Sequence, residues 1–214
     1  MVYLLRIGKE SDVFTFPQAA EPLIGAFSIA FSPRTFQRVV ILILGAILWL
    51  RRRTITALLA LVAPAARGHW SDFHRLLSRA AWSMWPLGKV LAGLIVELIP
   101  SHQPVVVPVD DTAVGHKGRR VYGKGRHHDA IRSTHRHMVW LWGHQWVTVA
   151  INVKFRFASR PWALPVRCAL YRAEELNRSE GRRHKTPTRR AMPWMAALIP
   201  WFPARKFILV GDGG

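Results

Sequence analysis

The sequence predicts an α/β (α+β) fold in which a helical region precedes a sheet. Apolar residues recur at helical spacing through most of residues 34–100. In residues 104–214, short apolar runs of strand length replace that spacing, with one further helical segment among them. Residues 1–33 show no sustained period, and we expect them to form an irregular lead-in.

Charge is the strongest compositional feature of the chain. The 214 residues are half apolar, enough for a sizeable core, yet they carry 31 Lys and Arg against 12 Asp and Glu. The net charge of +19 exceeds what solubility needs and indicates a polyanionic partner, most commonly nucleic acid. Charge alone leaves a basic ribosome-associated protein and a membrane-surface protein open.

The compartment is expected to be the cytoplasm, in a bacterial, nucleoid-associated setting. The single cysteine, Cys168, excludes an internal disulfide, and we expect a small buried side chain in a reducing interior. No secretory signal pattern opens the sequence. The apolar run from Val39 to Leu50 is shorter than the roughly 20 residues that a membrane helix needs, so a buried helix followed by arginines is expected.

Several helices are predicted within residues 34–100, separated by turns at the Ala63-Pro64 region, Gly68 and Pro86. The clearest begins with Ser71 as N-cap. Its apolar face would comprise Phe73, Leu76, Leu77, Ala80, Ala81 and Met84. Arginines on the outer faces are either a DNA-phosphate surface or ordinary solvated residues; they are Arg51, Arg52, Arg53, Arg75 and Arg79.

Strand patterns dominate the second half. Residues 105–109 form an apolar run that is followed directly by Asp110 and Asp111. Pro108 is unfavourable within this predicted strand because proline lacks a backbone N–H for the ladder. In residues 144–153, Val147, Val149, Ile151 and Val153 share one face, and Val166, Cys168 and Leu170 repeat this alternation more briefly. After a loop at residues 177–185, a helix is expected from Thr186 and Pro187, which Pro193 should kink or shorten. Residues 207–210 then predict a second buried strand that leads to Asp212.

The aspartates that follow the two apolar runs suggest a metal centre. Transfer at a phosphodiester uses two divalent ions roughly 4 Å apart, held by hard oxygen ligands. Asp110 and Asp212 would meet at neighbouring strand ends and hold Mg²⁺ or Mn²⁺. The pattern by itself also fits ordinary loop aspartates. In a regular strand Asp110 and Asp111 point to opposite sides, so only one of them can face the metals.

A family resemblance strengthens this interpretation. The segments that carry it, in order, are residues 110–112, 117–125, 127–129, 142–144, 163–172 and 210–213. Together they resemble insertion-sequence DDE transposases over roughly residues 50–214. The resemblance implies an RNase H-like mixed sheet with flanking helices, incomplete here, preceded by a DNA-binding region at residues 34–100. It also implies an Asp-Asp-Glu triad whose first two acids lie on the first and fourth strands.

Carried over by position, the first acid is Asp110, which has Thr112 two positions later as in related transposases, with Asp111 as the alternative. The second acid is Asp212. The family's glutamate lies well downstream, whereas only Gly213 and Gly214 follow here, and Glu174 and Glu175 precede Asp212. We therefore expect a truncated or frameshifted copy that is inactive in catalysis on its own.

Two basic stretches are predicted to contact DNA. The first contains Lys117, Arg119, Arg120, Lys124 and Arg126; histidines in the same stretch leave a zinc site open, as does a plain solvated loop. The second contains Arg182, Arg183 and Lys185, which either bind a DNA end or form an ordinary solvated loop. Most tryptophans, including Trp82, Trp85, Trp140 and Trp142, are expected in the core rather than stacked on bases.

The leading hypothesis is a transposase, or a truncated one, that binds element-end and target DNA. Its intact form would cut and join phosphodiester bonds with two divalent metals, Mg²⁺ or Mn²⁺. It would act as a homo-oligomer and without a membrane partner. A non-catalytic DNA-binding remnant or regulator of transposition is the alternative. A membrane-associated basic protein built around residues 39–50 is a third.

Overall fold

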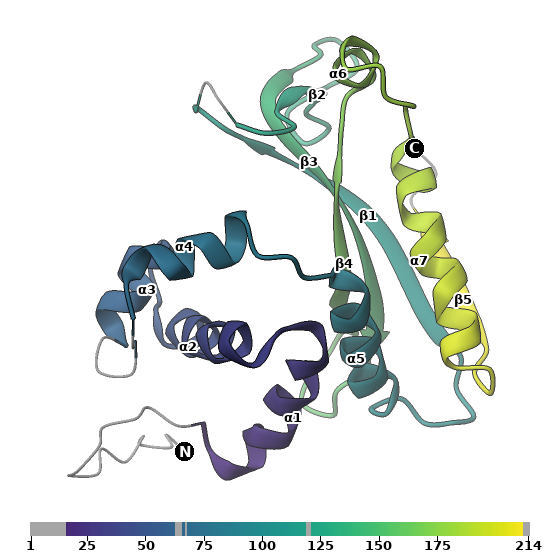
Figure 1. The fold of residues 1–214 in the computed structure, drawn as a ribbon. Coiled ribbons are helices and arrows are strands. Elements are labelled where there is room, and N and C mark those ends of the chain that lie inside the picture. The colour runs from purple at the N-terminus through teal and green to yellow at the C-terminus, as the bar shows by residue number, and fades with distance from the viewer. Residues whose placement is uncertain (1–15, 63–65, 67, 119–120, 212–214) are drawn as a thin grey trace. The chain divides into compact units, whose positions relative to one another are not determined.

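The computed structural model describes residues 16–62, 66, 68–118 and 121–211. The chain forms two compact units, Met1–Val90 and Leu91–Gly214 (Figure 1). The first is helical and the second contains the sheet. The division falls inside a helix, α5 (Met84–Val96), rather than in a linker.

The first unit is built from short helices around one apolar cluster. They are η1 (Gln18–Ala20), α1 (Glu21–Gly25), η2 (Ala26–Ala30), α2 (Pro33–Leu48), α3 (Ile55–Leu61) and α4 (Trp70–Ser78). The cluster joins Leu42 of α2, Leu58 and Leu59 of α3, and Phe73 and Leu76 of α4. The lead-in predicted to be irregular thus contains three short helical turns among its described residues.

Helix α2 contains the apolar run that invited a membrane interpretation. Ser32 caps its first turn, Pro33 occupies the first helical position, and the helix ends at Leu48, before three exposed arginines. The predicted helix forms, but it is buried on one side only: Leu42 and Leu44 are buried, whereas Ile47 is 60% exposed. Among the described residues, no helix is long and apolar enough to cross a membrane.

Helix α4 differs from its prediction at both ends. It begins at Trp70, and its N-cap is His69, whose ring Nδ1 accepts the N–H of Ser71; Ser71 therefore lies in the first turn. It ends at Ser78, so the predicted face is cut short. Phe73 and Leu76 are buried, but Leu77 is 59% exposed. Met84 starts the next helix, which places Pro86 in a first turn rather than between helices.

The second unit contains a five-stranded mixed sheet. Its strands are β1 (Val105–Gly115), β2 (Gly125–His128), β3 (Trp140–Val153), β4 (Trp162–Tyr171) and β5 (Phe207–Gly211). β1 lies between β3, to which it is antiparallel, and β5, to which it is parallel. On its other side β3 pairs with β2 at its start and with β4 along the remainder. The fold is α/β with a mixed sheet, as predicted.

The core lies on one face of this sheet. Cross-strand pairs such as Val109–Val149 place the odd-numbered residues of β1 and β3 on the same face. On that face Val105, Val107, Val147, Val149, Ile151 and Val153 are at most 2% exposed. They form one cluster with the second half of α5 and with α7 (Pro187–Trp201), which confirms the alternation predicted for residues 144–153.

Helix α7 begins where the sequence predicted. Thr186 is its N-cap and accepts the N–H of Arg189, and Pro187 occupies the first turn. Pro193 does not shorten the helix, which runs through it to Trp201. Trp194 and Leu198 are buried against the sheet, and this packing offsets the missing backbone hydrogen bond. The loop predicted at residues 177–185 is also shorter, because α6 (Glu174–Ser179) includes a buried Asn177.

Three burial predictions are wrong. Cys168 is exposed, because a bulge between Val149 and Ala150 leaves Val166 inside and pairs Cys168 with Thr148 on the opposite face. Residues 208–210 of β5 are about half exposed, since β5 is an edge strand of the described sheet. Trp85, Trp140 and Trp142 are 40%, 46% and 63% exposed rather than core residues.

Candidate active site

The two neighbouring aspartates lie within β1 and not at its tip, which corrects the prediction. β1 continues to Gly115 because β3 pairs with it along that length, including Asp110 with Thr148. The parallel ladder with β5 runs to the pair Val109–Gly211, which contains the last described residue of β5. Asp110 is the next residue of β1 after that pair.

The two carboxylates lie on opposite faces of the sheet. Asp111 pairs with Val147 and shares the core face, whereas Asp110 pairs with Thr148 on the other face. Both residues are exposed, and the Asp110 carboxylate accepts the backbone N–H of Asp111 at 2.8 Å. Only one of the two can thus contribute to a metal centre on a given face, as the sequence indicated.

A pocket of about 530 Å³ surrounds this position. Asp110 and Asp111 line it from β1, Leu209 to Gly211 line it from the end of β5, and residues 186–188 line it from the first turn of α7. A helix start carries unpaired N–H groups and a partial positive charge, which favour anions. The pocket therefore combines carboxylates with groups that suit a phosphate.

Asp212 lies outside the described residues, as do Arg119 and Arg120. The predicted approach of the Asp212 carboxylate to that of Asp110 therefore stays a prediction. Within the described ranges, no group of three His, Cys, Asp or Glu side chains is arranged to hold a metal ion. The exposed carboxylates of β1 are oxygen donors of the kind that Mg²⁺ and Mn²⁺ prefer, so the chemistry of the donors present fits the predicted ion.

A polar cluster on the Asp111 face was not recognised from the sequence. His127 of β2 is 2% exposed, and its burial lowers its pKa despite the opposing effect of Gln145. Its Nε2 has no hydrogen-bond partner among the described residues. Burial raises the pKa of Tyr171, and the charges of Glu174, Glu175 and Asp111 add to that shift. His127, Gln145 and Tyr171 come from three different strands, and only pairing of β2 and β4 with β3 brings them together.

The first basic stretch flanks the far end of β1. Lys117 and Arg126 are exposed, and the Lys124 ammonium donates to the carbonyl of Gly118 at 2.9 Å. The Arg126 guanidinium lies 4.5 Å from the ring centroid of Trp140. In the second stretch, Arg183 and Lys185 are exposed, whereas Arg182 pairs with Glu180 at 3.0 Å. That ion pair reduces the charge Arg182 offers to a phosphate.

The helical unit has a basic hollow of its own, of about 250 Å³. Arg38, Arg75 and Arg79 line it together with Asp72. Asp72 accepts from Arg38 at 2.9 Å and lies 3.5 Å from Arg75. Three guanidinium groups against one carboxylate leave an excess of positive charge at this hollow.

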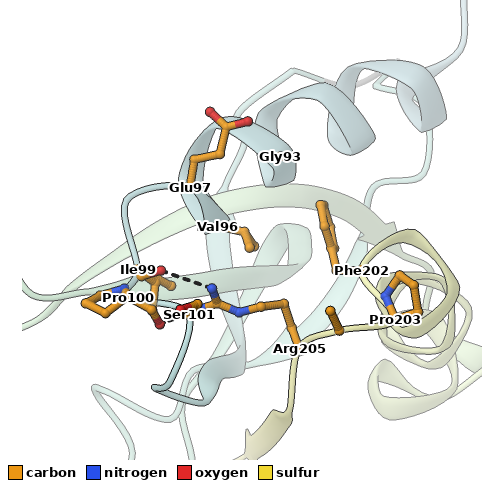
Figure 2. A pocket seen from close by; sticks show the side chains of 10 residues that line it. Gly93, Val96, Glu97, Ile99, Pro100, Ser101, Phe202, Pro203 and Arg205 are labelled. Atoms are coloured by element: carbon orange, nitrogen blue, oxygen red, sulfur yellow. Dashed lines mark hydrogen bonds between the residues drawn. The ribbon is translucent and has the colours of Figure 1, made fainter.

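A further pocket, of about 490 Å³, lies between the ends of α5 and α7 (Figure 2). Its one inward cation, Arg205, donates to the carbonyl oxygens of Ile99, Pro100 and Gln103 at 3.0–3.3 Å. Figure 2 shows the carboxylate of Glu97 pointing away from Arg205. The hydrogen-bonding capacity of Arg205 is thus used to join two loops, and the pocket lacks the acidic pair found in β1.

The second unit is thus an α/β unit with a mixed sheet and an acidic pair on one of its central strands. The family model for DDE superfamily endonucleases matches residues 26–214. The chain belongs to this family, and its mixed sheet is of the RNase H-like type. Members generally use divalent metals and act on nucleic acid. No curated protein and no solved structure matches the chain.

Proposed function

We propose that this chain is a transposase-type endonuclease whose metal-binding acids are Asp110 and Asp212. The observation that carries the proposal is the register of the parallel ladder. From Val105–Phe207 to Val109–Gly211, each pair advances by one residue in both strands. The next pair in that register would join Asp110 to residue 212, and paired residues of a regular ladder point to the same face.

The spacing that this register implies suits the chemistry. Neighbouring strands lie about 4.8 Å apart, close to the separation of roughly 4 Å between two catalytic divalent ions. Asp111 is the alternative first acid, and it is supported by its position on the face that α7 covers. The register favours Asp110, because Asp111 would oppose Gly213 instead.

The residues of this site would have two roles, metal binding and phosphate binding. Asp110 and Asp212 would hold Mg²⁺ or Mn²⁺, which when bound activates an attacking oxygen and stabilises a leaving one. The first turn of α7, which lines the same pocket, would place its N–H groups near a DNA phosphate. The proposed substrate is element-end and target DNA, bound by a homo-oligomer associated with the bacterial nucleoid.

The exposed basic residues would hold the DNA. The exposed ones are Lys117, Arg126, Arg183 and Lys185 in the sheet unit and Arg75 and Arg79 in the helical unit, and the half-buried Lys124 and Arg38 lie beside them. Such contacts are electrostatic and independent of sequence, so they support DNA affinity without identifying the target site.

The test combines ion binding with DNA cleavage. Calorimetric titration with Mn²⁺, and cleavage of element-end DNA in Mg²⁺ or Mn²⁺, are measured for the unaltered chain and for Asp110→Asn, Asp212→Asn and Asp111→Asn. We expect the first two variants to lose Mn²⁺ binding and any cleavage, and Asp111→Asn to keep both. Loss in Asp111→Asn alone would assign the first acid to Asp111. DNA binding without Mn²⁺ binding in the unaltered chain would overturn the nuclease proposal in favour of a DNA-binding regulator.

A further inference from the structure

Two large aromatic side chains are exposed at the start of β3. Trp140 and Trp142 are 46% and 63% exposed, although tryptophan is among the most burial-prone side chains on average. They stand two residues apart and therefore share one face of the strand. That face is opposite to the one covered by α5 and α7, since Leu141 and Val147 alternate with them.

Positive and titratable groups lie directly across the ladder from these rings. Arg126 pairs with Trp142, and His128 pairs with Trp140. The Arg126 guanidinium lies 4.5 Å from the centroid of the Trp140 ring, and the His128 ring meets the same indole edge-on at 5.7 Å. A cation held against an indole in this way leaves its donors available to an anion.

The aromatic surface continues along β3 toward Asp110. The next residues on the same face are His144 and Trp146, whose ring centroids are 5.8 Å apart, and both are partly exposed. Thr148 follows, and it is the cross-strand partner of Asp110. At about 3.3 Å per residue, Trp142 stands roughly 20 Å along the strand from that pair. We name Trp140, Trp142, His144 and Trp146 the aromatic row.

We propose that the aromatic row binds unpaired bases of a single DNA strand that leads to the Asp110 face. Exposed indoles offer flat surfaces on which bases stack, and every base has such a face. Arg126 supplies a charge-assisted contact to the intervening phosphate. In a duplex the base faces are already stacked on one another, so the row suits a single strand.

The chemistry of the row argues against an apolar protein partner. A purely apolar docking surface would not place an arginine and two histidines among its rings, whereas a polyanion with aromatic bases matches both components. The excess of positive charge in the chain points to the same partner. The proposal rests on the nucleic-acid substrate of the proposed function, but not on which acids hold the metal.

The experiment measures binding of fluorescently labelled oligothymidine without divalent metal. We expect Trp140→Ala and Trp142→Ala each to weaken binding by about 5- to 100-fold, and Trp142→Phe to retain most of it because the ring remains. The matched control is Trp162→Ala, which removes an indole that is 51% exposed at the other end of β3, beside Val153. This control is expected to bind as the unaltered chain does. Near-ultraviolet circular dichroism checks that each variant is folded.

Salt separates stacking from phosphate contacts. Since stacking releases no counterions, the ratio of affinities between Trp142→Ala and the unaltered chain should stay constant as salt is raised. Equal losses in Trp162→Ala, or equal losses for duplex and single-stranded DNA, would overturn the proposal. Loss of self-association in Trp142→Ala with unchanged DNA affinity would instead assign the row to a contact between two copies. Mn²⁺ binding is measured without DNA, so failure of the stacking proposal is distinguishable from failure of the proposed metal site.

Discussion

Gly143 stands where three strands of the sheet approach most closely. It pairs with Gly115 of β1 on one side and with Gly125 of β2 on the other. A Cβ at Gly143 would overlap the carbonyl oxygen of Val114, which is backbone and cannot rotate away. The segment around Gly143 contributes to the family resemblance, and this crowding gives a physical reason for a glycine there.

Replacing this glycine should damage the sheet. We expect Gly143→Ala to lower the free energy of unfolding by about 3 kcal/mol, the upper end of the usual cost of overpacking. Urea unfolding followed by tryptophan fluorescence measures the change. The control is Gly93→Ala in α5, where an added Cβ meets no atom within 4 Å. It should stabilise the chain by up to about 1 kcal/mol, because alanine favours helix. Identical midpoints for the two variants would refute the explanation.

At the scale of elements, Arg205 joins the two loops that enter the central pair of strands. It lies between α7 and β5. Its guanidinium has no carboxylate partner among the described residues and donates to carbonyl oxygens of the loop between α5 and β1 (Figure 2). Beside it, the N–H of Val105 donates to the carbonyl of Lys206 at 2.8 Å. The start of the parallel ladder therefore depends on this side chain.

Removing the guanidinium should loosen that end of the ladder. We expect Arg205→Met, which keeps the apolar stem, to cost about 2–3 kcal/mol, because several carbonyl groups lose a charged donor. Hydrogen exchange of the Val105 amide should accelerate more than that of Val149 in the centre of the sheet. Lys206→Met, at an exposed neighbouring position, should leave both quantities unchanged. A uniform acceleration across the sheet would indicate global rather than local destabilisation.

The sequence identified most elements but not their ends. Thr186 and Pro187 encode the start of α7 locally, since a cap and a first-turn proline act within one turn. The end of β1 is not encoded in this way. Asp110, Asp111 and Thr112 have the composition of a loop, yet pairing with β3 holds them in a strand. Strand length here is decided by a partner more than 30 residues away, which no local pattern contains.

For the whole molecule, the net charge of +19 is the property that bears most on binding. A protein that neutralises phosphates releases counterions, so its DNA affinity falls linearly on a logarithmic salt scale. The arginine hollow of the helical unit, lined by Arg38, Arg75 and Arg79, is one place where such contacts can form. Arg79 has no carboxylate within an ion-pair distance among the described residues.

Neutralising Arg79 should therefore change the salt dependence of binding. We expect Arg79→Gln to reduce the slope of the logarithm of the duplex DNA affinity against the logarithm of salt by about 1. The control is Arg178→Gln, because the charge of Arg178 is paired with Glu174 at 3.0 Å. Its slope should match that of the unaltered chain. If both variants shift the slope equally, the hollow has no special role in the contact.

By itself the sequence determined the class of fold, the alternation that buries one face of β3, the start of α7, and the acidic pair that marks the candidate site. These features depend on residue type and on spacing along a single segment. The tertiary structure decided that Asp110 and Asp111 lie within a strand, that Cys168 is exposed, and that Trp140 and Trp142 form a surface rather than a core. Exposure and register depend on which segments lie opposite one another, and that is fixed only when distant parts of the chain pair and pack.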